Sequence, residues 1–259
     1  MVRPEREVHG GAATGRLVDK TVWSRMITME EYGLHPPIEE YLEAIHCLAE
    51  ENKAVIQARI AERLGRSAPS VSEMLDRMEL EGYIARDGRT IVLTSQGRRR
   101  AERVVRKHRL AECLLVDIIG IAWHKAHLEA GKWEHVISDE VEERLVVLLG
   151  NPTTCPHGNP IPGCPSPTTT PEDQMRLVDT HPGDAVQLKR ITEEGALDQA
   201  SLAFLDRYGL TPGRVAFVTD VYPSGNMLIE YDSVSVELPA HICEQIYVTM
   251  HKQSRAEVG

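Results

Sequence analysis

Apolar residues recur at helical spacing in the first third of the chain. Over residues 38–52 they fall on one face of a helix, and two further helices are predicted at 55–64 and 68–80. A Gly-Arg-Ser break separates the last two, and Ser67 is suited to cap the second of them. A helix, a short turn and a second helix form a helix-turn-helix.

The pattern then changes to a short hairpin. Residues 83–86 and 89–93 are mainly apolar and flank an Asp-Gly turn, which favours two antiparallel strands. A hairpin placed directly after a helix-turn-helix is a wing. The sequence therefore predicts a winged helix-turn-helix as the first folded unit.

Helical spacing returns after the hairpin. Helices are expected at 95–120, 123–135 and 138–149, and their apolar faces are too few to enclose a core alone. The stripe formed by Leu114, Leu115, Ile118 and Ile119 is interpreted as a dimer surface, although it could equally pack within the chain.

Proline then interrupts all regular structure between residues 151 and 170. Cys155, His157 and Cys164 lie there, but a zinc site lacks a fourth ligand and paired spacing, so a loop and linker are preferred. From residue 184 onward, short alternating runs with turn signals predict a small, mostly β barrel.

The predicted fold class is α+β and multidomain. It has a winged helix-turn-helix, a helical dimerisation domain and a C-terminal small β barrel. The expected ranges are a disordered tail 1–35, the DNA-binding domain 36–103, the helical domain 104–163, a linker 164–183, the β domain 184–251 and a tail 252–259.

Charge separates the first unit from the rest of the protein. The 259 residues carry a net charge of −10, yet residues 53–112 hold 14 Lys and Arg against 8 Asp and Glu, which is +6. A basic segment inside an acidic chain indicates one module that faces a polyanion, unless it is merely a solvated face.

Composition restricts the other possibilities. No apolar run approaches the roughly 18 residues of a membrane span and no signal peptide is evident, so a cytoplasmic protein is expected. The five cysteines are scattered and are predicted to be free thiols. No HExxH run, nucleophile elbow or phosphate loop is present, so an enzyme is not expected.

Candidate metal chemistry lies on two of the predicted helices. His127, Glu134 and His135 share one helical face, and His108 with Glu112 forms an i, i+4 pair on the preceding helix. Neutral imidazole and carboxylate suit a divalent transition metal. The alternative is a solvated polar face with partly buried histidines.

Several runs of this sequence resemble the diphtheria toxin repressor family of metal-dependent transcriptional regulators. They are EEYLEAIHCLAEE, ARIAERL, SAPSVSEMLDRMELEGYI, RKHRLAE, HLEAGKWEHVISDEVEERL and HGNPIPG, within residues 36–163. The resemblance implies a homodimer in which metal sets the spacing of two winged helices on a palindromic DNA operator, repressing metal-homeostasis genes. It also implies a Src-homology-3-like C-terminal domain.

The resemblance assigns metal ligands by position. It implies an ancillary site with His108, Glu112 and His127, and a primary site with Glu134, His135 and two carboxylates of the first helix, Glu40 and Glu43. Gly131 stands where the family has a cysteine or glutamate ligand. Asp198 and Gln199 are candidates for a further ancillary ligand.

The implied ion is Mn²⁺ or Fe²⁺, and Zn²⁺, Co²⁺ or Ni²⁺ are expected to substitute in vitro. The implied DNA contacts lie on the recognition helix and the wing. They are Ser67, Pro69, Ser70, Glu73, Arg86 and Arg89.

Two alternatives follow from Gly131. A regulator of the same fold could have lost or altered its metal response, because a primary ligand is missing. A metal-dependent hydrolase could use the same histidines and carboxylates, with the open position at Gly131.

Overall fold

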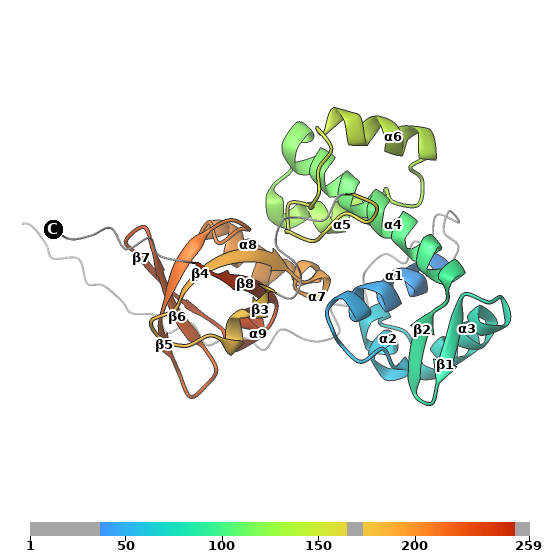
Figure 1. Ribbon diagram of the computed structural model, residues 1–259, viewed down its shortest axis with the longest axis horizontal. Helices are drawn as coiled ribbons and strands as arrows, with labels where there is room; N and C mark the ends of the chain where they lie inside the picture. The colour runs from blue at the N-terminus through green and yellow to red at the C-terminus, as the bar shows by residue number, and fades with distance from the viewer. Residues whose placement is uncertain (1–36, 165–172, 252–259) are drawn as a thin grey trace, which may run out of the picture.

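The computed structural model describes residues 37–164 and 173–251, which form three units along the chain (Figure 1). The predicted tails, 1–35 and 252–259, and residues 165–172 of the predicted linker lie outside the described residues.

The first unit is the predicted winged helix-turn-helix. It contains helices α1 (Pro37–Glu50), α2 (Gln57–Leu64) and α3 (Ala68–Leu80), followed by strands β1 (Ile84–Asp87) and β2 (Thr90–Leu93). The two strands pair antiparallel.

Local chemistry explains the turn between the helices of this unit. Gly65 ends α2 in the left-handed conformation, at φ 61°, and the side chain of Ser67 accepts a hydrogen bond from the amide of Ser70 at the start of α3. Leu42, Ile60 and Leu75 are fully buried between the three helices. Burial of these apolar side chains fixes the orientation of α3.

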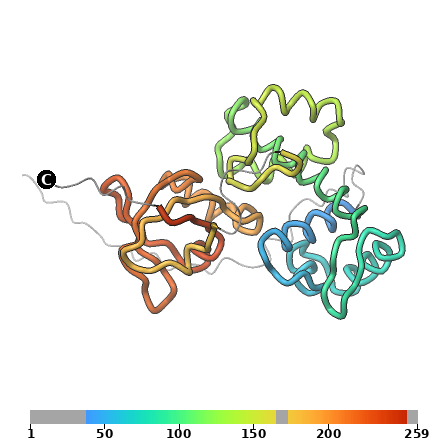
Figure 2. The backbone as a smooth tube through the Cα atoms, in the orientation of Figure 1, coloured from blue at the N-terminus to red at the C-terminus, as the bar shows by residue number. Residues whose placement is uncertain are grey.

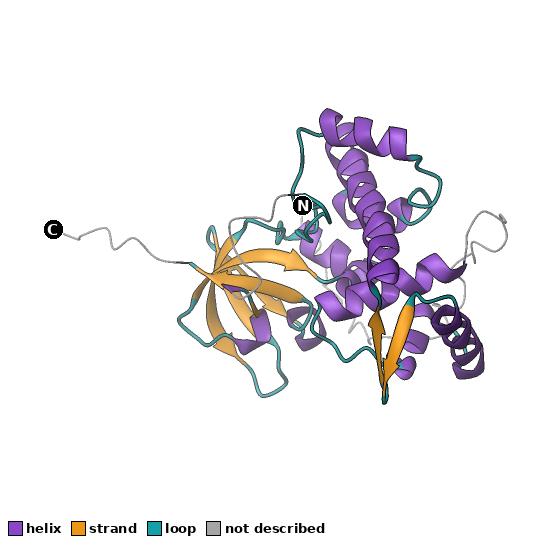
Figure 3. Cartoon of the chain, turned by 45° about the vertical axis from the view of Figure 1, so that its right-hand side comes forward, coloured by secondary structure: helices purple, strands orange, loops and turns teal. Residues whose placement is uncertain are grey.

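The second unit is built on the long helix α4 (Ser95–Cys113), which continues as a π-helical segment over Leu114–Ile119. In Figure 3 this helix rises from the winged unit to the remaining helices. These are a 3-10 turn, Trp123–Lys125, and the helices α5 (Ala126–Ala130) and α6 (Asp139–Leu148).

The prediction of one helix over 123–135 is wrong. The α-helix ends at Ala130, and residues 131–136 form successive turns. Some of their amides bond carbonyls three residues back, as Lys132 does to Glu129, and others bond four residues back, as Glu134 does to Ala130. Gly131 is a poor helix former and lies where the change begins. Glu134 and His135 are consequently presented by a turn.

The third unit contains a six-stranded antiparallel sheet. Its strand order is β3-β8-β4-β5-β6-β7. The elements are β3 (Met175–Arg176), β4 (Ala185–Ile191), α7 (Glu193–Leu197), α8 (Gln199–Arg207), β5 (Val215–Val221), β6 (Met227–Tyr231), β7 (Val234–Leu238), α9 (Ala240–Cys243) and β8 (Ile246–Met250). The last strand begins only at Ile246, because Ile242 and Cys243 belong to α9.

The third unit contacts both of the others, and in Figure 2 it lies beside them, coloured orange and red. Tyr247 donates its hydroxyl to the carbonyl oxygen of Glu51, just after α1, at 3.3 Å. Trp123 of the second unit packs against the core of the third unit. Residues far apart in the sequence therefore meet where the three units join.

The apolar stripe at the end of α4, interpreted from the sequence as a dimer surface, is partly buried within the chain and partly exposed. Leu115 is buried within the chain, whereas Ile118 and Ile119 are about half exposed. Val147, at 74% exposure, and Leu148 add to the exposed apolar residues of this unit. Within the described ranges, no helix combines the length and the apolarity needed to cross a membrane.

Candidate metal centre

Four imidazole and carboxylate side chains meet where α4 passes the turn after α5. His108 is 3% exposed, and its Nδ1 forms a hydrogen bond with the carboxylate of Glu134. Its Nε2 lies 3.2 Å from Oε1 of Glu112 and 2.9 Å from Nδ1 of His127. His108 therefore lies between two groups of potential ligands.

The carboxylate of Glu112 is the centre of the first group. Its Oε1 lies 3.2 Å from His108 Nε2, 2.9 Å from His127 Nδ1 and 3.0 Å from His157 Nδ1. Its Oε2 is buried and has no hydrogen-bond partner among the described residues. A buried oxygen without a partner is costly, and a cation would satisfy it while accepting the imidazole lone pairs. The residues present thus fit a divalent metal.

The loop after α6 supplies part of this group. Glu112, Cys155 and His157 offer ligand atoms within 4.8 Å of one another, as do His108, Glu112 and His127. Gly158 makes the loop possible, because a Cβ there would lie 2.0 Å from the carbonyl oxygen of Lys189. In the sequence, the signal for these ligands is Cys155 and His157, which lie two residues apart. The sequence predicts a loop there, because the paired spacing of a zinc site is missing.

The third unit adds a carboxylate to the same group. Oε2 of Glu193, at the start of α7, lies 3.5 Å from Nδ1 of His127, and Oε1 accepts from the buried Arg109. Asp198 instead caps α8 by accepting from the amides of Ala200 and Ser201. Glu193 is not among the ligands predicted from the sequence. The residue predicted in this region is Asp198, which lies five positions further along the chain.

The second group lies on the other side of His108. Glu43, His108 and Glu134 form a third set of ligand atoms within 4.8 Å, and Glu43 Oε1 is 4.0 Å from His108 Nδ1. His135 contacts Glu134 through Nε2 and Glu39 through Nδ1, both at 2.9 Å.

The remaining first-helix carboxylate points to a different neighbour. Glu40 Oε2 lies 3.8 Å from Arg66 in the turn between α2 and α3. Of the acidic residues predicted from α1, the structure therefore brings Glu43 to the buried cluster. It also brings in Glu39, which the sequence reading did not include.

Opposite charges set the protonation of this second group. Burial disfavours an ionised Glu134, but the charge of His108 and its hydrogen bonds outweigh this and lower the pKa of Glu134 to about 2. Burial also disfavours a charged His135, yet hydrogen bonds with Glu134 and Glu39 raise its pKa to about 10. Burial and the Glu134 charge raise the pKa of Glu43 to about 8. The group therefore holds protons that a bound cation would displace.

The predicted DNA face is exposed on α3 and the wing. Ser67, Pro69, Ser70 and Glu73 are all exposed at the start of α3, and Arg89 is exposed on the wing. No ion pair joins Arg89 to another residue in the described ranges.

Arg86, which the resemblance implies as a DNA contact, already forms ion pairs within the winged unit. Its guanidinium lies 2.6 Å from Asp76 and 2.8 Å from Glu79, both on α3. It therefore braces the wing against the recognition helix and offsets two of the acidic charges there. A phosphate would have to compete with these carboxylates for it.

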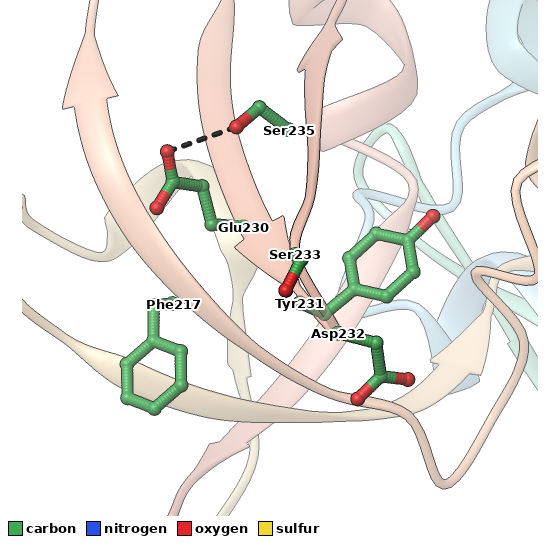
Figure 4. A pocket seen from close by; sticks show the side chains of 6 residues that line it. All are labelled: Phe217, Glu230, Tyr231, Asp232, Ser233 and Ser235. Carbon is green, nitrogen blue, oxygen red and sulfur yellow. Dashed lines mark hydrogen bonds between the residues drawn. The ribbon is translucent and has the colours of Figure 1, made fainter.

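A separate hollow lies on the third unit, away from the metal ligands (Figure 4). It is lined by Phe217, Glu230, Tyr231, Asp232, Ser233 and Ser235. Ser235 donates a hydrogen bond to Glu230 at 2.9 Å across it. No histidine or cysteine lines it, so it does not belong to the candidate metal centre.

A winged helix-turn-helix joined to a buried cluster of imidazoles and carboxylates is the architecture of a metal-responsive DNA-binding regulator. Three family models match the chain in order. They are "Iron dependent repressor, N-terminal DNA binding domain" over residues 33–90, "Iron dependent repressor, metal binding and dimerisation domain" over 94–163, and "FeoA domain" over 175–250. The chain belongs to the iron-dependent repressor family.

Individual relatives agree with this assignment. The iron-dependent repressor IdeR of Mycobacterium tuberculosis is 40% identical over 219 residues, which cover 81% of this chain and 95% of the relative. The diphtheria toxin repressor of Corynebacterium diphtheriae is 52% identical over 126 residues, 48% of this chain and 56% of the relative.

Solved structures show the same three-part fold. A manganese-dependent transcriptional repressor in complex with manganese superposes with a TM-score of 0.74 at 30% identity, covering 83% of this chain and all of that one. IdeR of T. acidophilum gives a TM-score of 0.69 at 30% identity, over 84% of this chain and 99% of that one. The predicted fold class and family resemblance are therefore confirmed.

Proposed function

We propose that this protein is a dimeric transcriptional repressor that binds a palindromic operator when Mn²⁺ or Fe²⁺ occupies the buried cluster, and so controls metal-homeostasis genes. The observation that carries the proposal is the environment of Glu112. Three imidazole nitrogens point at one of its oxygens, and its other oxygen is buried and has no hydrogen-bond partner in the part of the chain that the structure describes. The names of the relatives, iron-dependent and manganese-dependent repressors, support the same ions.

Two neighbouring sets of side chains would hold the ions. The first set is His108, Glu112, His127, Cys155, His157 and Glu193, and the second is Glu43, Glu134 and His135, with Glu40 within the same helix. A bound cation would supply positive charge among these carboxylates. The single thiol of Cys155 leaves nitrogen and oxygen as the majority of donors, which suits Mn²⁺ or Fe²⁺.

The ligands come from all three units, and this gives metal binding a structural consequence. Glu43 belongs to α1 of the winged unit, His108 to α4 and Glu193 to the third unit. A cation shared by these elements would fix their relative orientation. In a dimer, that orientation sets the distance between two recognition helices, which must match successive turns of the DNA major groove.

The exposed apolar residues of the second unit support dimerisation. Ile118, Ile119, Val147 and Leu148 are half exposed or more. Burying such residues against a second copy would remove apolar surface from water. The basic winged unit would then be presented twice to cytoplasmic DNA, as a palindrome requires.

We assign the cluster a binding role and no catalytic one. His108, Glu112, His127 and His157 are each at most 7% exposed, so a substrate would have little access to them. The family consists of repressors, which favours the same conclusion.

The function can be tested by measuring metal content and operator affinity together. A duplex would first be selected by the wild-type protein from a randomised library with Mn²⁺ present. We expect Mn²⁺ or Fe²⁺ to strengthen binding to this duplex and not to a scrambled one. Equal affinity for the duplex with metal and after chelation would contradict the proposal.

Gly131 provides a prediction about the second set of ligands. Its φ of −57° suits any residue, and a Cβ there would approach only two carbonyl oxygens at 3.8 Å. Gly131→Glu would add a carboxylate where the family carries a ligand. We expect Mn²⁺ affinity by calorimetry to rise about tenfold, corresponding to roughly 1.4 kcal/mol.

Gly131→Ala is the control, because it makes the same backbone change without adding a ligand. Equal Mn²⁺ affinity in the alanine and glutamate variants would show that position 131 does not face the ion.

Arg89 provides a prediction about the wing. Because it is exposed and unpaired with other described residues, it is available to a DNA phosphate. Arg89→Ala should weaken binding to all duplexes and reduce the slope of log affinity against log salt by about one. Arg176→Ala, which removes an exposed ion pair with Asp179 in the third unit, should leave the slope unchanged. Loss confined to the selected duplex would indicate a base contact instead.

A further inference from the structure

A continuous series of contacts leads from His135 to the base of the wing. The Nδ1 of His135 lies 2.9 Å from Oε2 of Glu39 on α1. The other oxygen of Glu39 accepts two hydrogen bonds from Arg100 on α4, from Nε at 3.2 Å and from Nη2 at 3.0 Å. Arg100 then donates from Nη1 to the hydroxyl of Tyr83 at 2.8 Å. We call His135, Glu39, Arg100 and Tyr83 the contact chain.

Tyr83 lies where the recognition helix passes into the wing. Its amide donates to the carbonyl of Met78, in the last turn of α3, at 2.9 Å. Its own carbonyl accepts from the amide of Thr94, which joins β2 to α4, at 3.0 Å. A shift of Tyr83 would therefore move the end of α3 and both ends of the hairpin together.

The base of the wing is packed too closely to absorb such a shift. Gly97, in the first turn of α4, faces the carbonyl of Tyr83 so closely that a Cβ would lie 1.9 Å from that oxygen. The hydroxyl of Thr94 donates to the carbonyl of Gly82 at 2.7 Å. Displacement of the Tyr83 backbone would consequently be passed on to its neighbours.

We propose that Glu39 and Arg100 are positioning residues that transmit the ligation of His135 to the recognition helix and the wing. The inference rests on the proposed function. The hydrogen bond between Nδ1 and Glu39 holds the ring plane, as carboxylates behind metal-bound histidines do, so that an ion would bind at Nε2, the nitrogen that contacts Glu134 at 2.9 Å. An ion on Nε2 would fix the ring, the fixed ring would orient Glu39, and the carboxylate would hold Arg100 against Tyr83.

The physical content of the proposal is a coupling between two binding events. Metal would favour one arrangement of the winged unit, and DNA would select the same arrangement. Arg100 suits this role because its planar guanidinium bonds the carboxylate through two nitrogens and the tyrosine through the third. Its centre also lies 5.3 Å from the Tyr83 ring.

The test measures the coupling itself, as the ratio of the Kd for the selected duplex after chelation to the Kd with saturating Mn²⁺. Arg100→Ala breaks the contact chain in the middle, and Tyr83→Phe removes only the hydroxyl. We expect each to lower the ratio by about tenfold, within the range of known coupling energies. Mn²⁺ affinity without DNA should stay within about threefold of wild type, because neither residue is a proposed ligand.

A double variant separates transmission from general damage. If both residues act in one series, Arg100→Ala with Tyr83→Phe should lower the ratio no more than either change alone. Arg103→Ala is the matched control, because Arg103 lies on the same helix and pairs with Asp139 outside the contact chain. Its ratio should equal that of the wild type.

The outcomes distinguish this inference from the function on which it rests. If wild-type protein shows metal-stimulated binding and both single variants keep the full ratio, the contact chain does not transmit it. Additive losses in the double variant would likewise overturn the inference. If wild-type protein shows no stimulation by metal, the proposed function fails and this inference fails with it.

Discussion

Replacing His108 with alanine is expected to abolish metal-stimulated operator binding. The ring contacts Glu134 through one nitrogen, and Glu112 and His127 through the other. Its loss would remove a ligand from the first proposed set and the imidazole that contacts Glu134 of the second set. We expect Mn²⁺ affinity to fall by at least about 100-fold, a loss near 2.7 kcal/mol, as measured by calorimetry.

His124→Ala is a suitable control for this experiment. His124 also pairs with a carboxylate, Asp206, at 2.6 Å, but it lies outside the proposed ligand sets. It should leave the metal response intact. Circular dichroism and sedimentation would establish that the His108 variant remains folded and dimeric. A folded His108→Ala protein with the wild-type metal response would remove His108 from the ligand set.

Replacing Arg109 with alanine should cause the largest loss of stability. This guanidinium is fully buried and donates to Glu50 of α1, to Glu193 of α7 and to the carbonyl of Pro160. Without it, the buried Glu193 would lose its principal cation. Burial raises the pKa of this carboxyl, but the charges of Arg109, His127 and His108 together lower it to about 2. We expect the free energy of unfolding, from urea titrations, to drop by about 3–5 kcal/mol.

Arg103→Ala again offers a comparison, because its ion pair with Asp139 is exposed and should contribute little. Arg109→Lys should give an intermediate loss, since lysine keeps the charge and cannot span both carboxylates with a planar fork. An Arg109→Ala protein as stable as the Arg103 variant would mean that the neighbouring acids find other partners.

The sequence predicted the local parts of this molecule well. The helix-turn-helix and wing follow from apolar spacing, the Gly65 break and the Asp-Gly turn, all of which act over a few residues. The prediction failed at residues 131–136, where helical spacing continued into a segment that forms turns. Gly131 stands where the family carries a metal ligand, and in this chain it also lies where the helix ends.

In the candidate site, contacts between residues close in the sequence could be predicted, and contacts between distant residues could not. His108 and Glu112 are four residues apart on one helix, so their proximity could be predicted from the sequence. His157 and Glu112 are 45 positions apart, and Arg109 and Glu193 are 84 apart. Spacing along the chain carries no information about such pairs, because docking of the third unit and the loop after α6 brings them together.

The raised pKa of His135 has a consequence for how such a regulator would sense its surroundings. In the metal-free protein this imidazole keeps its proton far above neutral pH, held by Glu134 and Glu39. Under the proposed function, coordination must expel that proton. Metal ions and protons would therefore compete for this imidazole. When the cell interior acidifies, the same free metal concentration would occupy the site less and repress less.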